Sequence, residues 1–213
     1  MAREVVQPAP WVRGGPGVAM TYDEWLDLQD EDIHSEWVDG EGSWYMSASE
    51  RHQAVKGFLY VLLWLFCERF QLGIVRDAPM EMRLQNSARE PDIVVIRGEH
   101  RDRLAPMRLH GPADLVVELV STESVRRDQI IKRRQYEEAG VPEYWILDPR
   151  PGHDHAEFFA LNAERRYEPI APASDGRIYS RVLPGFAIDP AWLWQDPFPS
   201  TLDLVAGMSA PPS

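Results

Sequence analysis

The chain has 213 residues, 44% of them apolar and 26% charged, which fits one compact domain with a hydrophobic core and excludes wholesale disorder. Its 22 Lys and Arg residues stand against 34 Asp and Glu residues, so the formal net charge of −12 argues against binding nucleic acid through overall charge. A single cysteine excludes an intramolecular disulfide and a cysteine-rich zinc site.

The charge is unevenly distributed along the chain. Residues 21–50 contain ten carboxylates and no Lys or Arg, whereas residues 97–134 contain nine basic side chains and six acidic ones. Of the 22 cationic residues, only Lys56 and Lys132 are lysines. The acidic segment therefore accounts for most of the negative excess. Because the chain otherwise uses arginine, each of the two lysines invites a specific explanation.

The ends of the chain are rich in Pro, Gly, Ala and Ser. We expect a flexible N-terminal segment over residues 1–20, one domain over residues 21–195 and a flexible tail over residues 196–213. The first residues show no secretory signal, and the longest apolar run, residues 58–67, is too short to span a membrane. We therefore expect a cytoplasmic protein without a membrane partner.

The first half of the predicted domain combines a short helix, a hairpin and a long helix. Thr21 and Glu24 form a capping box, which predicts the start of the short helix. Residues 36–38 and 44–46 flank a turn sequence and predict the hairpin. Ser49 can cap a long helix that runs to about residue 70 and stops at Gly73. This helix is apolar on nearly all sides, so we expect it in the core or at a subunit interface, and the second possibility predicts a homodimer.

The second half of the domain alternates strands with one further helix. The apolar patterns predict strands over residues 74–76, 80–84, 92–96, 114–120 and 143–147, and a helix over residues 125–139 that ends at Gly140. Short aromatic segments after Gly152 are candidate edge strands. This order predicts a mixed α/β fold in which helices flank a central mixed β-sheet.

Two carboxylates lie within or beside predicted buried strands. Glu118 has aliphatic neighbours on both sides, and strand alternation places it on the same face as Val116 and Val120. A buried, unpaired carboxylate costs several kcal/mol, so Glu118 requires a cation, a metal ion or hydrogen bonds. Asp92 follows Pro91 at the start of another apolar strand. Structural roles remain open, namely a turn residue for Asp92 and a pair with arginine for Glu118, but two such acids could also hold a hard divalent cation.

The predicted helix after Glu118 adds a third element. Asp128, Lys132 and Tyr136 are spaced four residues apart and therefore share one helix face. An ordinary surface ion pair, worth roughly 0.2–0.5 kcal/mol, would explain the first two. The scarcity of lysine favours a more specific use, because a compact ammonium group can approach a phosphate as a point charge.

Four segments in this order resemble the signature of the large prokaryotic Uma-type family of restriction endonucleases, within the PD-(D/E)XK nuclease superfamily. They are Glu90-Pro91-Asp92 with the apolar run after it, residues 117–121, the face formed by Asp128, Lys132 and Tyr136, and residues 140–149. Glu36 to Gly40, followed by His52, also resembles the opening of that family. The resemblance covers roughly residues 20–195, and its part from residue 114 to 149 is specific in order and spacing.

The resemblance implies a restriction-endonuclease-like core and a nuclease site that depends on Mg²⁺ or Mn²⁺. By position, Asp92 and Glu118 are the implied catalytic acids and metal ligands. The superfamily expects a lysine two residues after Glu118, but this chain has Val120 there. The resemblance suggests that Lys132 takes over the lysine's catalytic role.

The resemblance also implies further residues at this site. Glu36 is a candidate additional catalytic carboxylate, and His52, Asp128 and Tyr136 are candidates for lining the site.

The leading functional hypothesis is an endonuclease that hydrolyses DNA phosphodiester bonds with metal assistance. The alternative is a catalytically inactive binding or scaffold protein with a nuclease fold, which Val120 and the net charge of −12 favour. A glycosidase built on the two carboxylates is a remote third possibility, because it leaves the lysine without a role.

Overall fold

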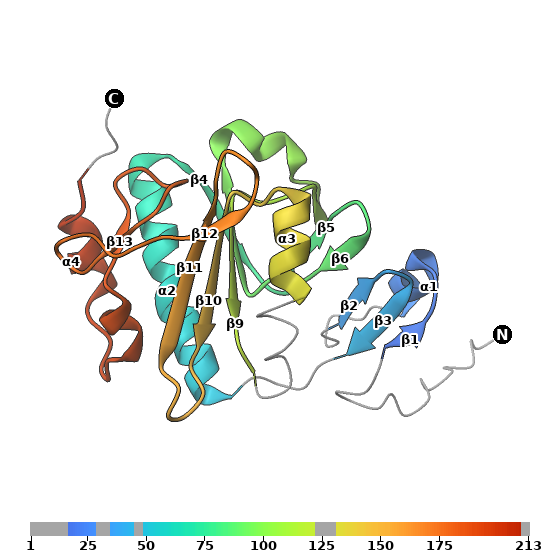
Figure 1. Cartoon of the computed structure of the whole chain (residues 1–213), viewed down its shortest axis with the longest axis horizontal. Helices are drawn as coiled ribbons and strands as arrows, with labels where there is room; N and C mark the ends of the chain where they lie inside the picture. Colours follow the sequence, from blue (N-terminus) through green and yellow to red (C-terminus); the bar gives the residue numbers. More distant parts are fainter. Residues whose placement is uncertain (1–16, 29–34, 45–48, 122–130, 210–213) are drawn as a thin grey trace.

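A computed structural model describes residues 17–28, 35–44, 49–121 and 131–209 (Figure 1). The strands are β1 (Val18–Ala19), β2 (Ser35–Val38), β3 (Glu41–Trp44), β4 (Gly73–Asp77), β5 (Glu81–Arg83), β6 (Ser87–Arg89), β7 (Ile93–Arg97), β8 (Arg108–His110), β9 (Leu115–Leu119), β10 (Glu143–Asp148), β11 (His155–Leu161), β12 (Tyr167–Pro169), β13 (Ile178–Tyr179) and β14 (Ala187–Ile188). The helices are α1 (Tyr22–Asp27), α2 (Glu50–Phe70), α3 (Arg133–Ala139) and α4 (Thr201–Ala206), with 3₁₀ helices η1 (Gly98–Arg103) and η3 (Pro190–Trp194).

The main sheet is mixed, as the sequence predicts. Its strand order is β12-β11-β10-β9-β7-β4. β9 and β10 are parallel, and the other neighbouring pairs are antiparallel. The parallel pair is connected through a crossover that includes α3, as parallel strands require. The expected central mixed sheet flanked by helices is confirmed.

A second sheet, with the order β1-β3-β2-β6-β5-β8, stands beside the main one (Figure 1). The sequence predicted its β2–β3 hairpin and β5. It did not predict β6 and β8, because strands of three residues are too short to show a recognisable alternation. The second strand of the hairpin begins at Glu41, three residues earlier than expected, since the turn consists of Asp39 and Gly40 with positive φ angles.

Helix α2 covers one face of the main sheet. Ser49 caps it as expected, because its hydroxyl accepts the His52 N–H at 3.3 Å. The helix ends at Gln71 in a left-handed conformation, and Gly73, the predicted stop, begins β4 instead. Eight side chains of α2 are buried, while Val61 and Trp64 are each 40% exposed. The helix is therefore mainly a core element.

The opposite face of the main sheet packs against α3 and the second sheet. The predicted alternation in β9 is confirmed. Leu115, Val117 and Leu119 belong to the cluster around α2, and Val116 and Val120 belong to the cluster on the other face. That other cluster combines Tyr136 of α3 with residues of β5 and β8. This arrangement places the side chain of Glu118 on the α3 face.

The capping box of α1 is confirmed, with Thr21 and Glu24 each accepting a backbone N–H of the other. Of the helix predicted over residues 125–139, the structure describes α3 and its ending at Gly140, while residues 125–130 lie outside the described residues. The predicted strand after Gly140 is β10, and the aromatic segments after Gly152 include β11, β12 and β13.

Residues 196–209, in the segment predicted to be a flexible tail, pack against α2 in the structure. Phe198 stacks on Phe58 of α2, with ring centroids 4.8 Å apart. α4 then buries Val205, whose backbone oxygen accepts a hydrogen bond from Arg69 of α2 at 2.6 Å. Composition suggested mobility because the apolar residues of this segment are sparse, but those it has cover α2. At the other end, β1 begins within the segment expected to be flexible.

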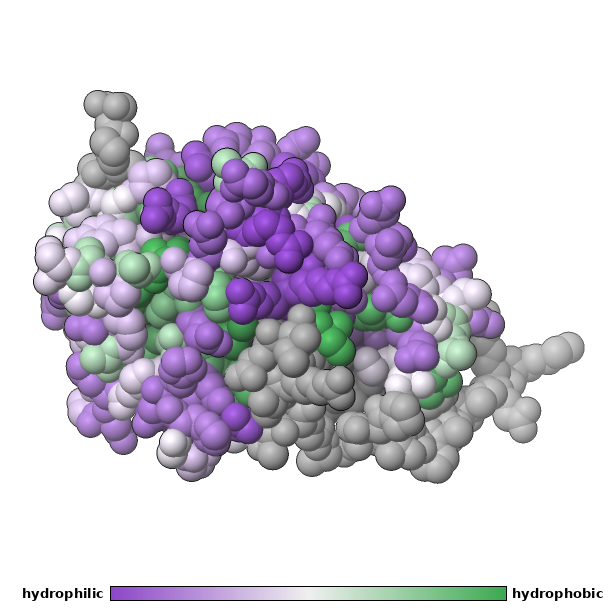
Figure 2. Space-filling model, viewed as in Figure 1, coloured by the Kyte–Doolittle hydropathy of each residue, from purple (hydrophilic) through white to green (hydrophobic). Residues whose placement is uncertain are grey.

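The face of the molecule seen in Figure 2 is predominantly hydrophilic, and its apolar residues are visible in limited areas. Within the part of the chain that the structure describes, no helix is both long and apolar enough to cross a membrane.

Candidate functional site

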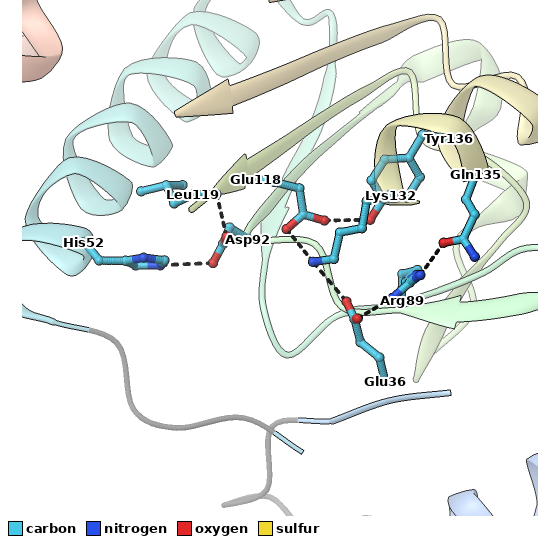
Figure 3. A network of polar contacts seen from close by, with 9 residues as sticks. All are labelled: Glu36, His52, Arg89, Asp92, Glu118, Leu119, Lys132, Gln135 and Tyr136. Carbon is cyan, nitrogen blue, oxygen red and sulfur yellow. Dashed lines mark hydrogen bonds and ion pairs between the residues drawn. The ribbon is translucent and has the colours of Figure 1, made fainter. Parts of the chain in front are cut away.

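The two strand-associated acids come together because β7 and β9 are antiparallel neighbours. Ile93 pairs with Val117, so Asp92, directly before β7, comes next to Glu118 at the same end of both strands. The backbone N–H of Leu119 donates to Asp92 Oδ2 at 2.8 Å. Strand register alone therefore brings these two acids to one position in the fold (Figure 3).

Glu118 is 2% exposed and is stabilised by two side chains of the following crossover. Lys132 Nζ lies 2.9 Å from its Oε2, and the Tyr136 hydroxyl donates to its Oε1 at 2.6 Å. Lys132 and Tyr136 reach the same carboxylate because they are four residues apart, so the predicted shared face is confirmed for this pair. Among the residues that the structure describes, the cationic partner of Glu118 is thus the rare lysine, Lys132.

A second carboxylate reaches Lys132 from the small sheet. Glu36 of β2 is 1% exposed, and its Oε1 lies 3.2 Å from Lys132 Nζ. Arg89 of β6 donates to the other oxygen of Glu36 and also to Gln135 of α3 (Figure 3). Lys132 is therefore held between two buried carboxylates, one from each sheet.

Asp92 is stabilised as an anion. Its Oδ1 lies 3.3 Å from His52 Nε2 at the start of α2. Burial opposes ionisation, but the His52 hydrogen bond and charge, the Leu119 N–H and the charge of Lys132 outweigh it and lower the pKa of Asp92. The carboxylate of Asp92 is consequently available as a negatively charged oxygen donor.

Two neighbouring groups keep their protons more strongly than usual. Burial, followed by the charges of Glu118 and Glu36, raises the pKa of Tyr136, so its hydroxyl remains a donor to Glu118. Burial and then the charge of Glu36 raise the pKa of Glu90 to about 8. Burial in the first place, and the negative charge of Glu36 in the second, therefore make a further nearby carboxyl resist ionisation.

The structure brings together all the predicted site residues that it describes, namely Glu36, His52, Asp92, Glu118, Lys132 and Tyr136. Asp128 lies outside the described residues. Val120, at the position where the resemblance leads one to expect lysine, is buried in the apolar cluster on the α3 face. Lys132 from the neighbouring helix provides an ammonium group at Glu118.

Sequence reasoning missed Arg89 and Gln135. Arg89 belongs to one of the very short strands, and Gln135 is one residue in a polar helix. The only available signal was the position of Arg89 directly before the Glu90-Pro91-Asp92 motif.

The donor chemistry of the site suits a hard divalent cation. Among the residues that the structure describes, no three His, Cys, Asp or Glu side chains are grouped closely enough to hold a metal ion by themselves. Mg²⁺ needs no such group, because it typically binds one or two carboxylates and keeps several waters or binds substrate phosphate oxygens. Asp92 and Glu118 supply carboxylates of this kind on adjacent strands.

Comparisons with known proteins agree with the fold. The family model Uma2, described as "Putative restriction endonuclease", matches residues 20–191. A crystal structure described as a putative nuclease belonging to DUF820, from Anabaena variabilis ATCC 29413, is similar with a TM-score of 0.65 and 15% sequence identity, covering 81% of this chain and 96% of that chain. No curated protein matches the sequence. Because the family model spans most of the chain and includes every predicted site residue, the chain belongs to the Uma2 family of putative restriction endonucleases.

Proposed function

We propose that this protein is a metal-dependent endonuclease that hydrolyses phosphodiester bonds in DNA. The observation that carries the proposal is the buried contact of Lys132 with Glu118 at 2.9 Å, beside Asp92 on the adjacent strand. Two acids at the ends of neighbouring strands, with a lysine from the start of α3 beside them, form a set of groups that suits metal-assisted phosphate hydrolysis. Membership in the Uma2 family supports the same class of reaction.

Asp92 and Glu118 would hold the cation, Mg²⁺ or Mn²⁺. When bound, such an ion lowers the pKa of a coordinated water and offsets negative charge on phosphate oxygens. The low pKa of Asp92 keeps one of the two ligands ionised at neutral pH. The Tyr136 hydroxyl fixes the orientation of the Glu118 carboxylate through its 2.6 Å hydrogen bond.

Lys132 would provide a fixed positive charge for the phosphate group undergoing hydrolysis. It contacts both Glu118 and Glu36, so the ammonium keeps an anionic partner when one carboxylate engages another cation. A charge held in place before reaction stabilises developing negative charge without reorganisation. His52 would keep Asp92 in position through the 3.3 Å contact.

DNA is the proposed substrate in spite of the net charge of −12. The acidic excess lies largely in residues 21–50, and some acids of the site are the proposed metal ligands, whose charge a cation would offset. We therefore expect DNA binding that is weak, metal-dependent and sensitive to salt.

The test is cleavage of supercoiled plasmid in Mg²⁺ or Mn²⁺ by the purified protein and three isosteric variants, Asp92→Asn, Glu118→Gln and Lys132→Met. We expect each variant to cleave roughly 10²-fold to 10³-fold more slowly than the wild type, the loss typical of removing one electrostatic group from an active site. Asp77→Asn is the matched control, because Asp77 is a half-exposed carboxylate on the neighbouring strand β4 that pairs with Lys56. Nicking at the wild-type rate in all three site variants would refute the assignment.

A catalytically inactive binding protein is the second candidate. It is favoured by Val120, which leaves the strand without the superfamily's lysine and is 1% exposed in the core. Titration calorimetry separates the two candidates, because the endonuclease must bind Mg²⁺ or Mn²⁺ and lose this binding in Asp92→Asn. Absence of metal binding by the wild type would favour the inactive protein.

A further inference from the structure

Arg89 bridges the two parts of the molecule that hold Lys132. It is 2% exposed, and the register of β2 with β6 places it opposite Glu36. One of its terminal nitrogens, Nη1, donates to Glu36 Oε2, and the other, Nη2, donates to Gln135 Oε1 (Figure 3). A planar guanidinium group can make both contacts at once, whereas an ammonium group on a flexible stem would not hold the same fork.

These contacts form a closed ring that includes Lys132. Gln135 lies three residues after Lys132, so the two side chains project from neighbouring positions on the same part of the crossover. Glu36 contacts Lys132 at 3.2 Å, and Arg89 joins Glu36 to Gln135. Arg89 thereby fixes both the carboxylate that faces Lys132 and the helix that carries it.

The charges indicate what this ring does. Glu36 and Glu118 both attract Lys132, and each of the three side chains is less than 10% exposed. In such surroundings ionic attraction is stronger than in water. Arg89 satisfies one oxygen of Glu36 and so weakens the pull of Glu36 on the ammonium. Without Arg89, Lys132 would move toward Glu36 and away from Glu118.

We propose that Arg89 is a positioning residue, which acts through Glu36 and Gln135 to keep Lys132 at Glu118. The catalytic consequence rests on the proposed nuclease function. The placement of Lys132 is independent of that function, so it can be measured separately.

The chain contains only two lysines, which makes the placement of Lys132 directly observable. Lysine labelled with ¹³C at Cε yields two side-chain signals, assigned with Lys56→Arg and Lys132→Arg. We expect Arg89→Met to shift the Lys132 signal at constant pH without metal. Arg89→Lys, which adds a third lysine signal that the wild type lacks, should shift the Lys132 signal less. The Lys56 signal should stay in place, because Lys56 pairs with Asp77 at 3.3 Å in another part of the fold.

A double-variant comparison distinguishes positioning through Glu36 from general disturbance of the core. In a Glu36→Gln background, Arg89→Met should shift Lys132 much less than in the wild-type background, because the competing carboxylate has been neutralised. Equal shifts in the two backgrounds, or an unmoved Lys132 signal in folded Arg89→Met, would overturn the proposal. If Arg89→Met does not fold, Gln135→Met provides the same test from the helix side, with a smaller shift expected.

Plasmid cleavage provides the functional readout. Arg89→Met should lower kcat about tenfold or more and leave KM for DNA within about twofold, because Arg89 orients Lys132 rather than binding substrate. Arg134→Met is the matched control, because Arg134 is an exposed arginine of α3 that pairs with Glu138. An unchanged kcat in Arg89→Met would reject the catalytic consequence. Failure of the wild type to cleave would reject the proposed function, while the lysine signals would still test the positioning.

Discussion

At the scale of single residues, Glu118 shows how a carboxylate is accommodated in an apolar strand. Its two oxygens contact Lys132 and Tyr136, and both partners come from the crossover between β9 and β10. The burial that makes an isolated carboxylate unfavourable also strengthens these contacts. The stability of this region and its proposed chemistry therefore depend on the same three side chains.

Removal of Lys132 should destabilise the protein markedly. Lys132→Met leaves Glu36 and Glu118 without their shared ammonium, and breaking a buried ion pair in this way typically costs about 3–5 kcal/mol. Chemical denaturation should show a smaller loss for the double variant Lys132→Met/Glu118→Gln, because one buried charge is also removed. A larger loss in the double variant than in Lys132→Met would contradict this account.

Asp92 should make stability depend on pH in the acidic range. Its pKa in the folded protein is lowered from the ordinary value of 3.8, so folding favours the ionised form. The resulting contribution is fully present above pH 3.8 and is lost as the pH falls through the lower folded-state pKa. The difference in unfolding free energy between wild type and Asp92→Asn should therefore shrink as the pH falls below 3.8. A difference that grows on acidification would contradict the sign.

At the scale of elements, local sequence signals predicted where α1 and α2 begin, but they did not predict that the C-terminal segment packs on α2. Capping residues at Thr21 and Ser49 begin α1 and α2 as predicted, because a cap is a contact between near neighbours in sequence. α4 packs on α2 from more than a hundred residues away, as the contact between Arg69 and Val205 shows. Only a few apolar residues make this contact, too few to produce a visible pattern in the sequence.

The packing of α4 can be tested with two substitutions on the same helix. Val205 is 5% exposed and Leu202 is 67% exposed. Val205→Ala should lower the unfolding free energy by about 1.5–2.5 kcal/mol, since it removes buried methyl groups, and Leu202→Ala should change it by less than about 0.5 kcal/mol. Equal effects of the two substitutions in thermal or chemical denaturation would mean that α4 does not pack as described.

At the scale of the whole molecule, the two sheets lie side by side (Figure 1), and the candidate site takes its side chains from both of them (Figure 3). The main sheet supplies Asp92 and Glu118, the small sheet supplies Glu36 and Arg89, and α3 with the residue before it supplies Gln135 and Lys132. Neither sheet holds the complete set of side chains. Any change in the relative position of the sheets would therefore alter the surroundings of Lys132.

The homodimer predicted from the apolar character of α2 stays a prediction. The structure accounts for most of that character by burial within one chain and leaves Val61 and Trp64 each 40% exposed on the outer side of the helix. If these residues form a subunit interface, light scattering coupled to gel filtration should show a dimer that Trp64→Glu converts to monomer. A monomeric wild type at high concentration would contradict the prediction.

The sequence by itself determined the local and periodic features of this protein. Alternation placed Glu118 on the other face of β9 from Val117 and Leu119. Four-residue spacing placed Lys132 and Tyr136 on one side of the helix, and motif order identified Asp92. These features depend on neighbours within a few residues, so they can be read from the chain. Only the tertiary structure decided that Lys132 is shared between Glu118 and Glu36 and that Arg89 joins Glu36 to Gln135. Arg89 lies 53 positions from Glu36 and 46 positions from Gln135 in the sequence. No local pattern encodes which distant side chains meet when two sheets pack together.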